Sequence, residues 1–261
     1  MYEKHFGLTE RPFSIAPDPR FLYMSRQHRE ALAHLLYGVG EGGGFVQLTG
    51  EVGTGKTTMS RCLLEQLPQE VDVALILNPR VTALELLASV CDELRIEYDA
   101  QTTSIKSLTD VLNEYLLEAH SRGRRTVLII DEARNLGSDA LEQVRLLTNL
   151  ETTREKLLQV ILVGQPELRV LLSRQELRQL SQRITARYHL EPIRRDEIAA
   201  YISHRLEICG ATEALFSERA IDQIHNFSQG VPRLINVLCD RAMLGAFVEG
   251  KRRIEPQIVR K

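Results

Sequence analysis

Nine consecutive residues of this 261-residue chain have the types and spacing needed to hold a phosphate chain. They are Gly50, Glu51, Val52, Gly53, Thr54, Gly55, Lys56, Thr57 and Thr58, which match the pattern G-x-x-x-x-G-K-T. Glycines let backbone N–H groups form a concave surface around phosphate oxygens, Lys56 supplies a positive charge, and the Thr57 hydroxyl is a Mg²⁺ ligand. This stretch predicts a phosphate loop. The alternative is a glycine-rich turn before an ordinary helix.

The residues around this loop are of the kind that would position it. Residues 45–49 alternate like a β-strand, and residues 59–67 have helical spacing. The loop therefore lies on a strand-to-helix turn, which is the context that a phosphate loop requires.

A second candidate is a pair of carboxylates, Asp131 and Glu132, directly after the apolar run 126–130. Such a run is typical of a strand buried on both faces of a parallel sheet, and its carboxyl end is where α/β sheets bind ligands. We expect Asp131 to hold Mg²⁺, directly or through water, and Glu132 to polarise the water that attacks the γ-phosphate. The pair could also cap the following helix. Together with the phosphate loop it predicts a nucleoside triphosphatase.

Further apolar patterns complete an α/β core. Runs of buried-strand character occur at residues 72–78, 158–165 and 188–190, and helical patterns occur at residues 82–94, 107–120 and 138–150. We expect the helices to cover a parallel sheet.

The composition sets wider limits. Hydrophobic residues make up 43% of the chain, and 33 basic residues nearly balance 35 acidic ones, so no overall basic field indicates nucleic acid. The four cysteines are far apart, which predicts reduced thiols, and the seven histidines lack the spacing of a transition-metal site. No apolar run approaches the roughly 18 residues of a membrane span, and there is no signal-like N-terminus. These features predict a soluble cytosolic protein.

Residues 1–23 are rich in aromatic residues and prolines, which favour an extended arm over a regular helix. Leu8, Pro12 and Phe13 are candidates for an apolar slot that receives a nucleotide base. A plain packing arm is the alternative. Ser25 is expected to cap a helix that continues to about Val39.

Several short groups resemble the ExeA/GspA group of AAA+ ATPases, which includes MSHA pilus biogenesis proteins. They are Tyr2, Phe6-Gly7-Leu8, Pro12-Phe13, Pro17-Asp18-Pro19, Leu22-Tyr23, His28, Glu30-Ala31-Leu32, Tyr37-Gly38 and the phosphate loop. The resemblance covers nearly the whole chain. It implies ATP as the nucleotide and assembly of a type II secretion system or type IV pilus at the inner membrane. The chain is then either a short member of the group or an excised ATPase region.

The resemblance also implies roles for polar residues near strand ends. Asn78 is the candidate for holding Glu132 inactive, and Gln165 is the candidate sensor-1 residue that orients the lytic water. Arg183 or Arg187 is expected to be a finger that completes the site of a neighbouring subunit in a homo-oligomeric ring or partial ring. The alternatives are turn residues for the two amides, and surface ion pairs with Glu176 or Glu191 for the arginines.

After residue 192 the sequence contains three helical patterns and no strand, at residues 196–208, 217–227 and 232–248. Residues 230–236 resemble a sensor-2 motif, in which Pro232 starts a helix and Arg233 points to the nucleotide. A cation at a helix N-terminus opposes the helix dipole, which makes a purely structural role less attractive.

The expected protein is thus an α/β P-loop NTPase of the AAA+ class. A parallel-sheet core with the N-terminal arm occupies residues 1–192, a small all-helical lid occupies residues 193–261, and MgATP is the cofactor. Expected partners are inner-membrane secretion or pilus components, with a cytoplasmic location that includes a peripheral position at that membrane. Two other classes stay open: a nucleotide-gated DNA-binding protein similar to the MuB/TniB ATPases, and a P-loop kinase.

Overall fold

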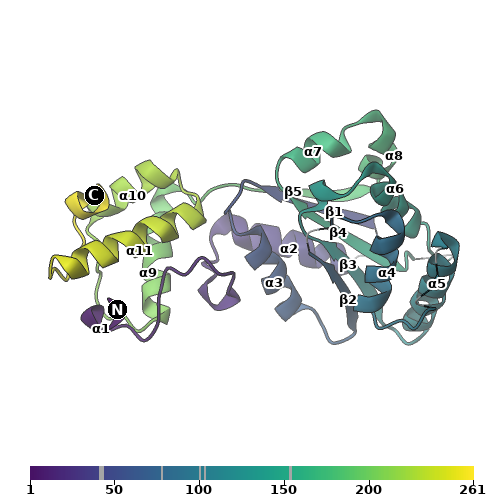
Figure 1. The fold of residues 1–261 in the computed structure, drawn as a ribbon, viewed down its shortest axis with the longest axis horizontal. Helices are drawn as coiled ribbons and strands as arrows, with labels where there is room; N and C mark the ends of the chain where they lie inside the picture. The colour runs from purple at the N-terminus through teal and green to yellow at the C-terminus, as the bar shows by residue number, and fades with distance from the viewer. Residues whose placement is uncertain (41–43, 78, 100, 103, 153–154) are drawn as a thin grey trace. The chain divides into compact units, whose positions relative to one another are not determined.

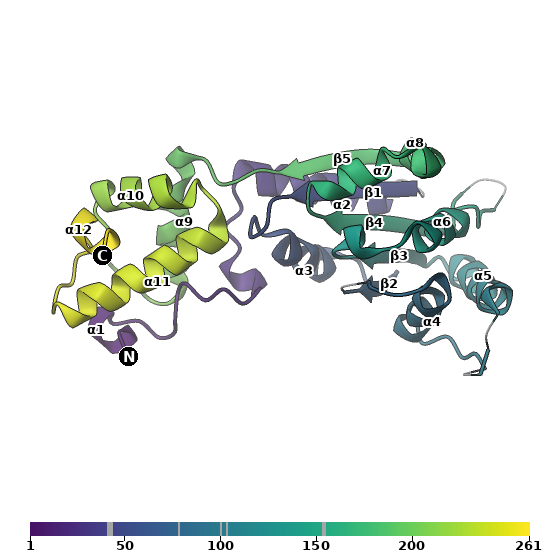
Figure 2. The ribbon, with the colours of Figure 1, turned by 45° about the horizontal axis from the view of Figure 1, so that its top comes forward.

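The computed structural model describes residues 1–40, 44–77, 79–99, 101–102, 104–152 and 155–261 (Figures 1 and 2). The chain divides into two compact units. Glu30–Gly50 and Leu63–His189 form one, here called the sheet unit, and Met1–Arg29, Glu51–Cys62 and Leu190–Lys261 form the other, here called the helical unit.

The sheet unit is built on a five-stranded sheet in the order β2-β3-β4-β1-β5. Its strands are β1 (Gly44–Gly50), β2 (Val71–Ile76), β3 (Arg125–Ile130), β4 (Leu158–Gly164) and β5 (Ile184–Leu190). The pairs β2–β3, β3–β4 and β4–β1 are parallel. Ile130 lies opposite both Ile76 and Leu162. The carboxyl ends of β2, β3 and β4 therefore meet at one edge of the sheet.

Helices cover the sheet because its strands are apolar on both faces. Phe45, Leu128 and Val160 belong to one buried cluster with side chains of α4 (Ala83–Glu93), α5 (Ile105–Ser121) and α6 (Ser138–Leu147). The alternate residue Val46 points to the other face, where it meets Gly38 of α2 (Arg26–Gly40). This core is almost entirely aliphatic.

Local chemistry sets the helix boundaries. Thr82 and Glu85 form a reciprocal capping box at the start of α4, and the Ser104 hydroxyl caps α5. Further helical segments are α3 (Lys56–Gln66), α7 (Glu167–Leu172), α8 (Arg178–Gln182), and the 3₁₀ turns η1 (Pro19–Phe21), η2 (Ala133–Asn135) and η3 (Gln175–Leu177).

The expected α/β fold with a parallel-sheet core is confirmed, with one difference in length. The sequence predicts the last strand at residues 188–190, whereas β5 starts at Ile184. Thr185 and Arg187 are exposed on this edge strand, so its first half lacks the continuous apolar run that marked the other strands.

The helical unit contains α9 (Arg195–Ile208), α10 (Glu218–Ser228), α11 (Pro232–Val248) and the short α1 (Glu3–Phe6) and α12 (Pro256–Val259). Its buried cluster includes four arm residues, Tyr2, Leu8, Phe13 and Phe21. The arm therefore packs with the C-terminal helices, although the expected boundary at residue 192 grouped it with the core.

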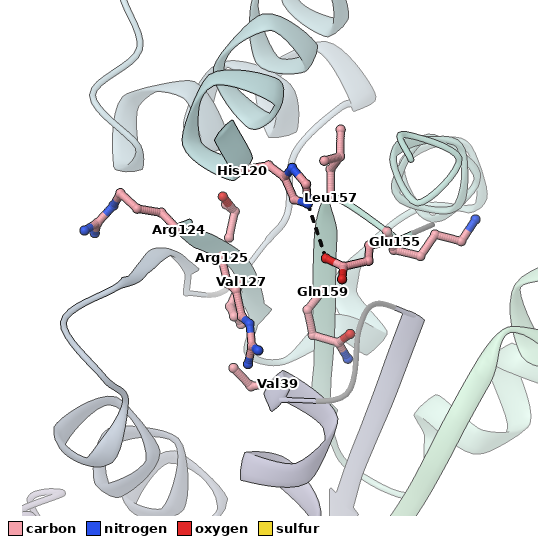
Figure 3. A pocket seen from close by; sticks show the side chains of 10 residues that line it. Val39, His120, Arg124, Arg125, Val127, Glu155, Leu157 and Gln159 are labelled. Atoms are coloured by element: carbon pink, nitrogen blue, oxygen red, sulfur yellow. Dashed lines mark hydrogen bonds and ion pairs between the residues drawn. The ribbon is translucent and has the colours of Figure 1, made fainter. Parts of the chain in front are cut away.

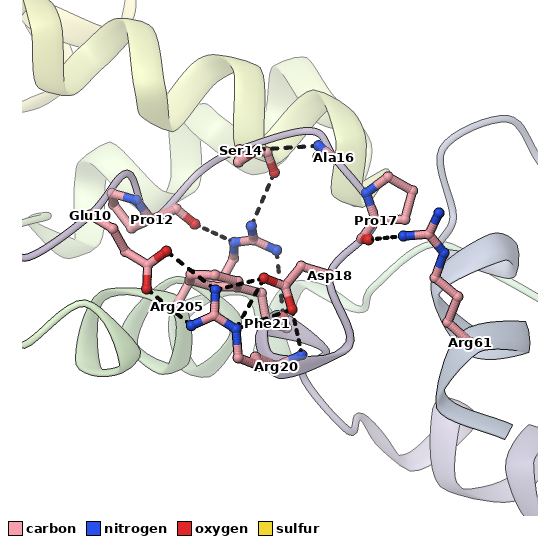
Figure 4. Close-up of polar contacts among 10 residues, drawn as sticks. All are labelled: Glu10, Pro12, Ser14, Ala16, Pro17, Asp18, Arg20, Phe21, Arg61 and Arg205. Atoms are coloured by element: carbon pink, nitrogen blue, oxygen red, sulfur yellow. Dashed lines mark hydrogen bonds and ion pairs between the residues drawn. The ribbon is translucent and has the colours of Figure 1, made fainter. Parts of the chain in front are cut away.

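One buried arginine holds the arm in place (Figure 4). Arg205 of α9 is 6% exposed. Its Nε donates to the Pro12 carbonyl at 2.6 Å and its Nη2 to the Ser14 carbonyl at 3.1 Å. The guanidinium also lies 4.7 Å from the centre of the Phe21 ring. A buried charge is tolerated here because the arm supplies carbonyl oxygens and an aromatic face.

Within the described part of the chain, no helix has both the length and the apolar character needed to cross a membrane.

Candidate functional site

The phosphate loop has the predicted setting, between β1 and the first residue of α3. Gly53 and Gly55 have φ values of 81° and 101°, a backbone conformation that residues with side chains rarely adopt. The Lys56 ammonium is buried and donates to the Glu51 carbonyl at 2.9 Å, and the Thr54 hydroxyl donates to the same carbonyl at 2.9 Å. The loop is thus closed on itself around Glu51.

Arg233, the expected sensor-2 residue, lies beside this loop within the helical unit. It is in the first turn of α11, whose first residue is Pro232. Its backbone N–H donates to the Gly53 carbonyl at 3.1 Å, and a Cβ on Gly53 would lie 2.6 Å from the Arg233 Cβ. Gly53 is therefore required both by its φ angle and by the close approach of α11. Contact of the Arg233 guanidinium with a nucleotide stays a prediction.

His28 also lies against the loop, and sequence reasoning gave it no role. Its ring is 3% exposed, and its Nδ1 lies 2.7 Å from the Ser25 hydroxyl. A Cβ on Gly55 would lie 3.4 Å from its Nε2, and burial lowers the pKa of His28 to about 4. The sequence signals were its place among the residues of the family resemblance and the serine three residues earlier, at a helix start.

The two carboxylates follow β3 in the sheet unit, as expected. Asp131 is 5% exposed, and its Oδ1 accepts the Glu132 backbone N–H at 2.8 Å. Glu132 has φ 50° and ψ 39°, in the left-handed region that non-glycine residues seldom occupy. Such strain is often found at functional sites, where the surrounding structure enforces it.

The structure brings Gln165 to Glu132, although they are 33 residues apart in sequence. The Gln165 Nε2 donates to Glu132 Oε2 at 3.3 Å. Both residues follow the ends of adjacent parallel strands, β3 and β4, which explains the contact. A sensor-1 residue would need this position, and that role stays a prediction.

Arg134 is a further residue that sequence reasoning missed. Its Nε lies 3.3 Å from Glu132 Oε2, and its Nη1 lies 3.7 Å from an oxygen of Glu167. The turn η2 brings the arginine back to the carboxylate two residues before it. One oxygen of Glu132 thus accepts a hydrogen bond from the Gln165 amide and lies within ion-pair distance of the Arg134 guanidinium, whose Nε makes no hydrogen bond among the described residues.

The two finger candidates have different surroundings in the sheet unit. Arg183 is half-buried, and its Nη1 donates to the Arg145 carbonyl at 3.1 Å and the Thr148 hydroxyl at 3.0 Å, at the end of α6. Arg187 is exposed and donates to the Ser181 hydroxyl at 3.2 Å. Arg187 also lines an open groove of about 340 Å³ between α7, α8 and β5.

The remaining candidates have mixed outcomes. Leu8 and Phe13 are buried in the arm cluster, where Phe13 meets the Phe216 ring edge-on, and the Pro12 carbonyl is bonded to Arg205. These contacts favour the packing arm, and base binding stays a prediction. Asn78 lies outside the described residues.

A small cavity opens at the amino-terminal ends of β3 and β4 (Figure 3). It measures about 40 Å³, and its wall includes Arg125, Gln159 and the His120–Glu155 pair, whose nearest atoms are 3.2 Å apart. Its size is that of one or two water molecules, so it cannot receive a nucleotide.

A family described as AAA domain matches residues 39–172. General secretion pathway protein A of Aeromonas hydrophila is 54% identical over 254 residues, which cover 97% of this chain and 46% of that protein. The chain therefore spans about half the length of this relative. The resemblance expected from the sequence is confirmed.

Solved structures share the fold at low sequence identity. Cdc6p of Pyrobaculum aerophilum superposes with a TM-score of 0.74 at 21% identity, covering 95% of this chain and 69% of that one. The ORC2 protein of Aeropyrum pernix superposes with a TM-score of 0.72 at 18% identity, covering 96% of this chain and 70% of that one. The RuvB branch migration motor of Thermotoga maritima superposes with a TM-score of 0.60 at 19% identity, covering 89% of this chain and 66% of that one. This chain belongs to the AAA domain family, as an AAA-type ATPase related to General secretion pathway protein A.

Proposed function

We propose that the protein is a Mg²⁺-dependent ATPase whose hydrolysis drives or gates assembly of a secretion or MSHA-like type IV pilus machine at the inner membrane. Hydrolysis is supported by the strand-end carboxylate Glu132, held through one oxygen by Gln165 and Arg134. The assembly role is supported by 54% identity to a protein named for the general secretion pathway.

The residues present suit a magnesium nucleotide. Mg²⁺ prefers oxygen ligands, and Thr57 and Asp131 offer a hydroxyl and a buried carboxylate. A magnesium ion held by ligands of this kind would neutralise charge on the phosphate oxygens. Lys56 adds a fixed positive charge, and the loop N–H groups bind the phosphates.

Glu132 acts on the attacking water. Gln165 and Arg134 hold Oε2, which orients the carboxylate and leaves the other oxygen to accept a proton from water. Orientation is as important as basicity, because a misplaced base loses much of its effect on rate.

Two variants test this proposal. Lys56→Ala should lose nucleotide affinity, whereas Glu132→Gln should bind ATP and not turn it over. Comparable steady-state turnover by Glu132→Gln and the wild type would remove Glu132 from the mechanism. Immobilised, ATP-loaded Glu132→Gln should retain secretion or pilus components from membrane extracts. Salt-sensitive binding of duplex DNA with no membrane partner would instead favour the MuB/TniB type of function.

We further propose that residues 193–261, with the arm packed on them, act as a lid coupled to the nucleotide through Arg233. Arg233→Ala should then weaken ATP binding more than ADP binding, because a γ-phosphate contact is selective for the triphosphate. Equal losses for the two nucleotides would indicate general damage to the lid.

The working form is proposed to be a ring or partial ring in which Arg183 or Arg187 completes a neighbouring site. Such a finger can contribute roughly 10³–10⁵ in rate, so turnover per subunit should rise with protein concentration. Mixing inactive Glu132→Gln with inactive Arg183→Ala should restore some activity, since some interfaces then join two intact residues. Recovery only with Arg187→Ala would move the assignment to Arg187. No recovery with either variant, although both assemble, would rule out a trans-acting arginine.

A further inference from the structure

We infer that Arg61 is a positioning residue of the nucleotide site: its hydrogen bond to the arm fixes the rotation of α3, and with it the direction of the Thr57 hydroxyl. This inference rests on the proposed role of the phosphate loop and of Thr57 in binding a magnesium nucleotide. Arg61, Thr57 and the arm all belong to the helical unit.

Arg61 and Thr57 lie on the same side of α3. Lys56 is the first residue of this helix, so Thr57 is in its first turn and Arg61 is one turn further along. Residues four positions apart are neighbours on a helix surface. A rotation of α3 about its axis that carried Arg61 away from its partner would therefore also turn Thr57 away from its position.

The partner of Arg61 is a backbone carbonyl of the arm (Figure 4). The Arg61 Nη1 donates to the Pro17 carbonyl, 44 residues earlier in the chain. Pro17 and Pro19 restrict the φ angles of this segment. Pro19 also begins the turn η1, and the Asp18 carboxylate accepts the Arg20 N–H at 2.9 Å. The acceptor therefore lies in a stiff part of the arm.

Two buried side chains anchor the same segment to the C-terminal helices. Arg205 of α9 and Asn236 of α11, each 6% exposed, donate to the Ser14 carbonyl at 3.1 and 3.4 Å. Asn236 lies about one turn after Arg233, whose N–H donates to the Gly53 carbonyl of the phosphate loop. The contacts therefore form a closed path from the loop through α11 and the arm to α3, which continues directly from the loop.

Exposure distinguishes the Arg61 contact from the anchors of the arm. Arg61 and Pro17 are both exposed, so water competes for their hydrogen bond and its removal should cost little stability. The buried guanidinium of Arg205 has far less competition from water. Removing the Arg61 donor should consequently leave the arm in place and lose only the orientation of α3.

Binding of a fluorescent ADP to the full chain, in saturating Mg²⁺ and in EDTA, tests the inference. Arg61→Met keeps most of the length of the side chain and cannot donate, so affinity with Mg²⁺ should fall about 3–10-fold. Affinity in EDTA should change less, because the Thr57 hydroxyl acts on the ion. Arg61→Lys keeps a donor and should recover most of the lost affinity. The melting temperature of both variants should match that of the wild type.

Arg29→Met is the matched control. Arg29 is an exposed arginine of the same unit, and its Nη1 donates to the Met24 carbonyl at 2.9 Å. Because this hydrogen bond does not involve α3, Arg29→Met should bind ADP like the wild type with and without Mg²⁺.

Two binding results would overturn the inference. One is a wild-type effect of Mg²⁺ in folded Arg61→Met while Lys56→Ala loses binding; if Lys56→Ala also binds normally, the proposed role of the loop itself is wrong. The other is an equal loss of affinity with and without Mg²⁺ in Arg61→Met, which would mean that Arg61 supports the whole loop and not Thr57 in particular.

A measurement on the wild type does not depend on any variant folding. Because coupling between two sites is reciprocal, Mg²⁺ and ADP together should slow amide hydrogen exchange in arm residues 13–22. Unchanged exchange there would contradict the coupling of the arm to the nucleotide. Slower exchange that persists in Arg61→Met would show that the nucleotide affects the arm without Arg61, which also overturns the inference.

Discussion

The phosphate loop and the carboxylate edge obtain their geometry in different ways. The loop is flanked by residues distant in sequence, since His28 lies next to Gly55 and the Arg233 N–H donates to the Gly53 carbonyl. Around Glu132 most of the support is local, because Asp131 accepts its N–H and Arg134 returns to its side chain. A motif can therefore be complete in its chemistry and still depend on distant residues for its shape.

The two units also differ in the kind of core that supports these residues. The sheet unit has an almost wholly aliphatic core. The helical unit adds buried polar contacts, such as those of Arg205 with the arm and the 2.7 Å hydrogen bond from Tyr201 to Asn236. Substitution of Glu132 at the carboxylate edge should consequently change rate, whereas substitution of the packing residues of the helical unit, away from the phosphate loop and Arg233, should change stability.

The largest expected effect is on rate, at the carboxylate edge. Glu132→Gln should lower turnover by roughly 10²–10⁴-fold, because the amide cannot accept a proton from water. Its melting temperature should stay close to that of the wild type. Steady-state hydrolysis and thermal melts check both, with Glu167→Gln as the control that should keep most activity. A large fall in melting temperature for Glu132→Gln would contradict the expectation that the carboxylate edge affects rate and not stability.

A glycine of the helical unit should show the opposite behaviour. A Cβ on Gly230, whose φ is 77°, would lie 2.1 Å from the Ile193 carbonyl oxygen. Gly230→Ala should therefore lower the free energy of unfolding by several kcal/mol, of which strain at positive φ accounts for roughly 1–3 kcal/mol.

Gly250→Ala is the matched control for this prediction. Gly250 has a φ of 66° and no atom within 4 Å of its Cβ position, so only the backbone strain applies. Denaturant unfolding compares the two variants. Equal destabilisation would show that the contact with Ile193 relaxes without cost.

The arm provides a test of intermediate size (Figure 4). Arg205→Met should cost about 1.5–3 kcal/mol in unfolding free energy, because hydrogen bonds from a buried charged group to the Pro12 and Ser14 carbonyls are lost. Arg20→Met is the control. Its pairs with Asp18 and Glu10 are exposed and should contribute little to stability. Similar losses in both variants would contradict a special role for the buried arginine.

The smallest expected effect is a pH dependence of the helical unit. Burial lowers the pKa of His28 to about 4 from its ordinary 6.5, so the unfolded chain binds a proton more readily between these values. Stability should therefore fall as the pH drops from about 6.5 to 4, by on the order of 1–3 kcal/mol, and His28 should contribute nothing above that range. His28→Gln should flatten this part of the stability curve. An unchanged stability curve would show that the pKa of His28 is not lowered in the folded protein.

The sequence was informative where the functional residues and the strand or helix that positions them are adjacent in the chain. Residues 126–130 predicted β3 because a buried parallel strand requires a continuous apolar run, and the strand end then placed Asp131 and Glu132. The expected alignment of strand ends also accounts for Gln165 next to Glu132. The phosphate loop was predictable for the same reason, since its pattern and flanking elements are local.

Other features depend on packing that no local pattern contains. In the sequence His28 is one polar residue of an amphipathic helix, whereas in the fold its Nε2 lies next to Gly55 of the phosphate loop. The arm was assigned by its place in the chain, yet Phe13 is buried against Phe216, about two hundred residues away in the sequence. Arg134 was missed because the turn η2, which brings it back to Glu132, follows from the backbone and not from any hydrophobic period.

The composition of the helical unit from three separate segments has a consequence for biosynthesis. The sheet unit is complete once residue 189 has left the ribosome, whereas the arm must wait for partners such as Phe216 and Asp240. During that interval Tyr2 and Phe13 are apolar groups without their native contacts on the nascent chain. Such long-range pairing slows folding and exposes surface to aggregation or chaperones. The phosphate loop should therefore acquire its final form only after the sheet unit is complete, because Arg233 follows that unit in the sequence.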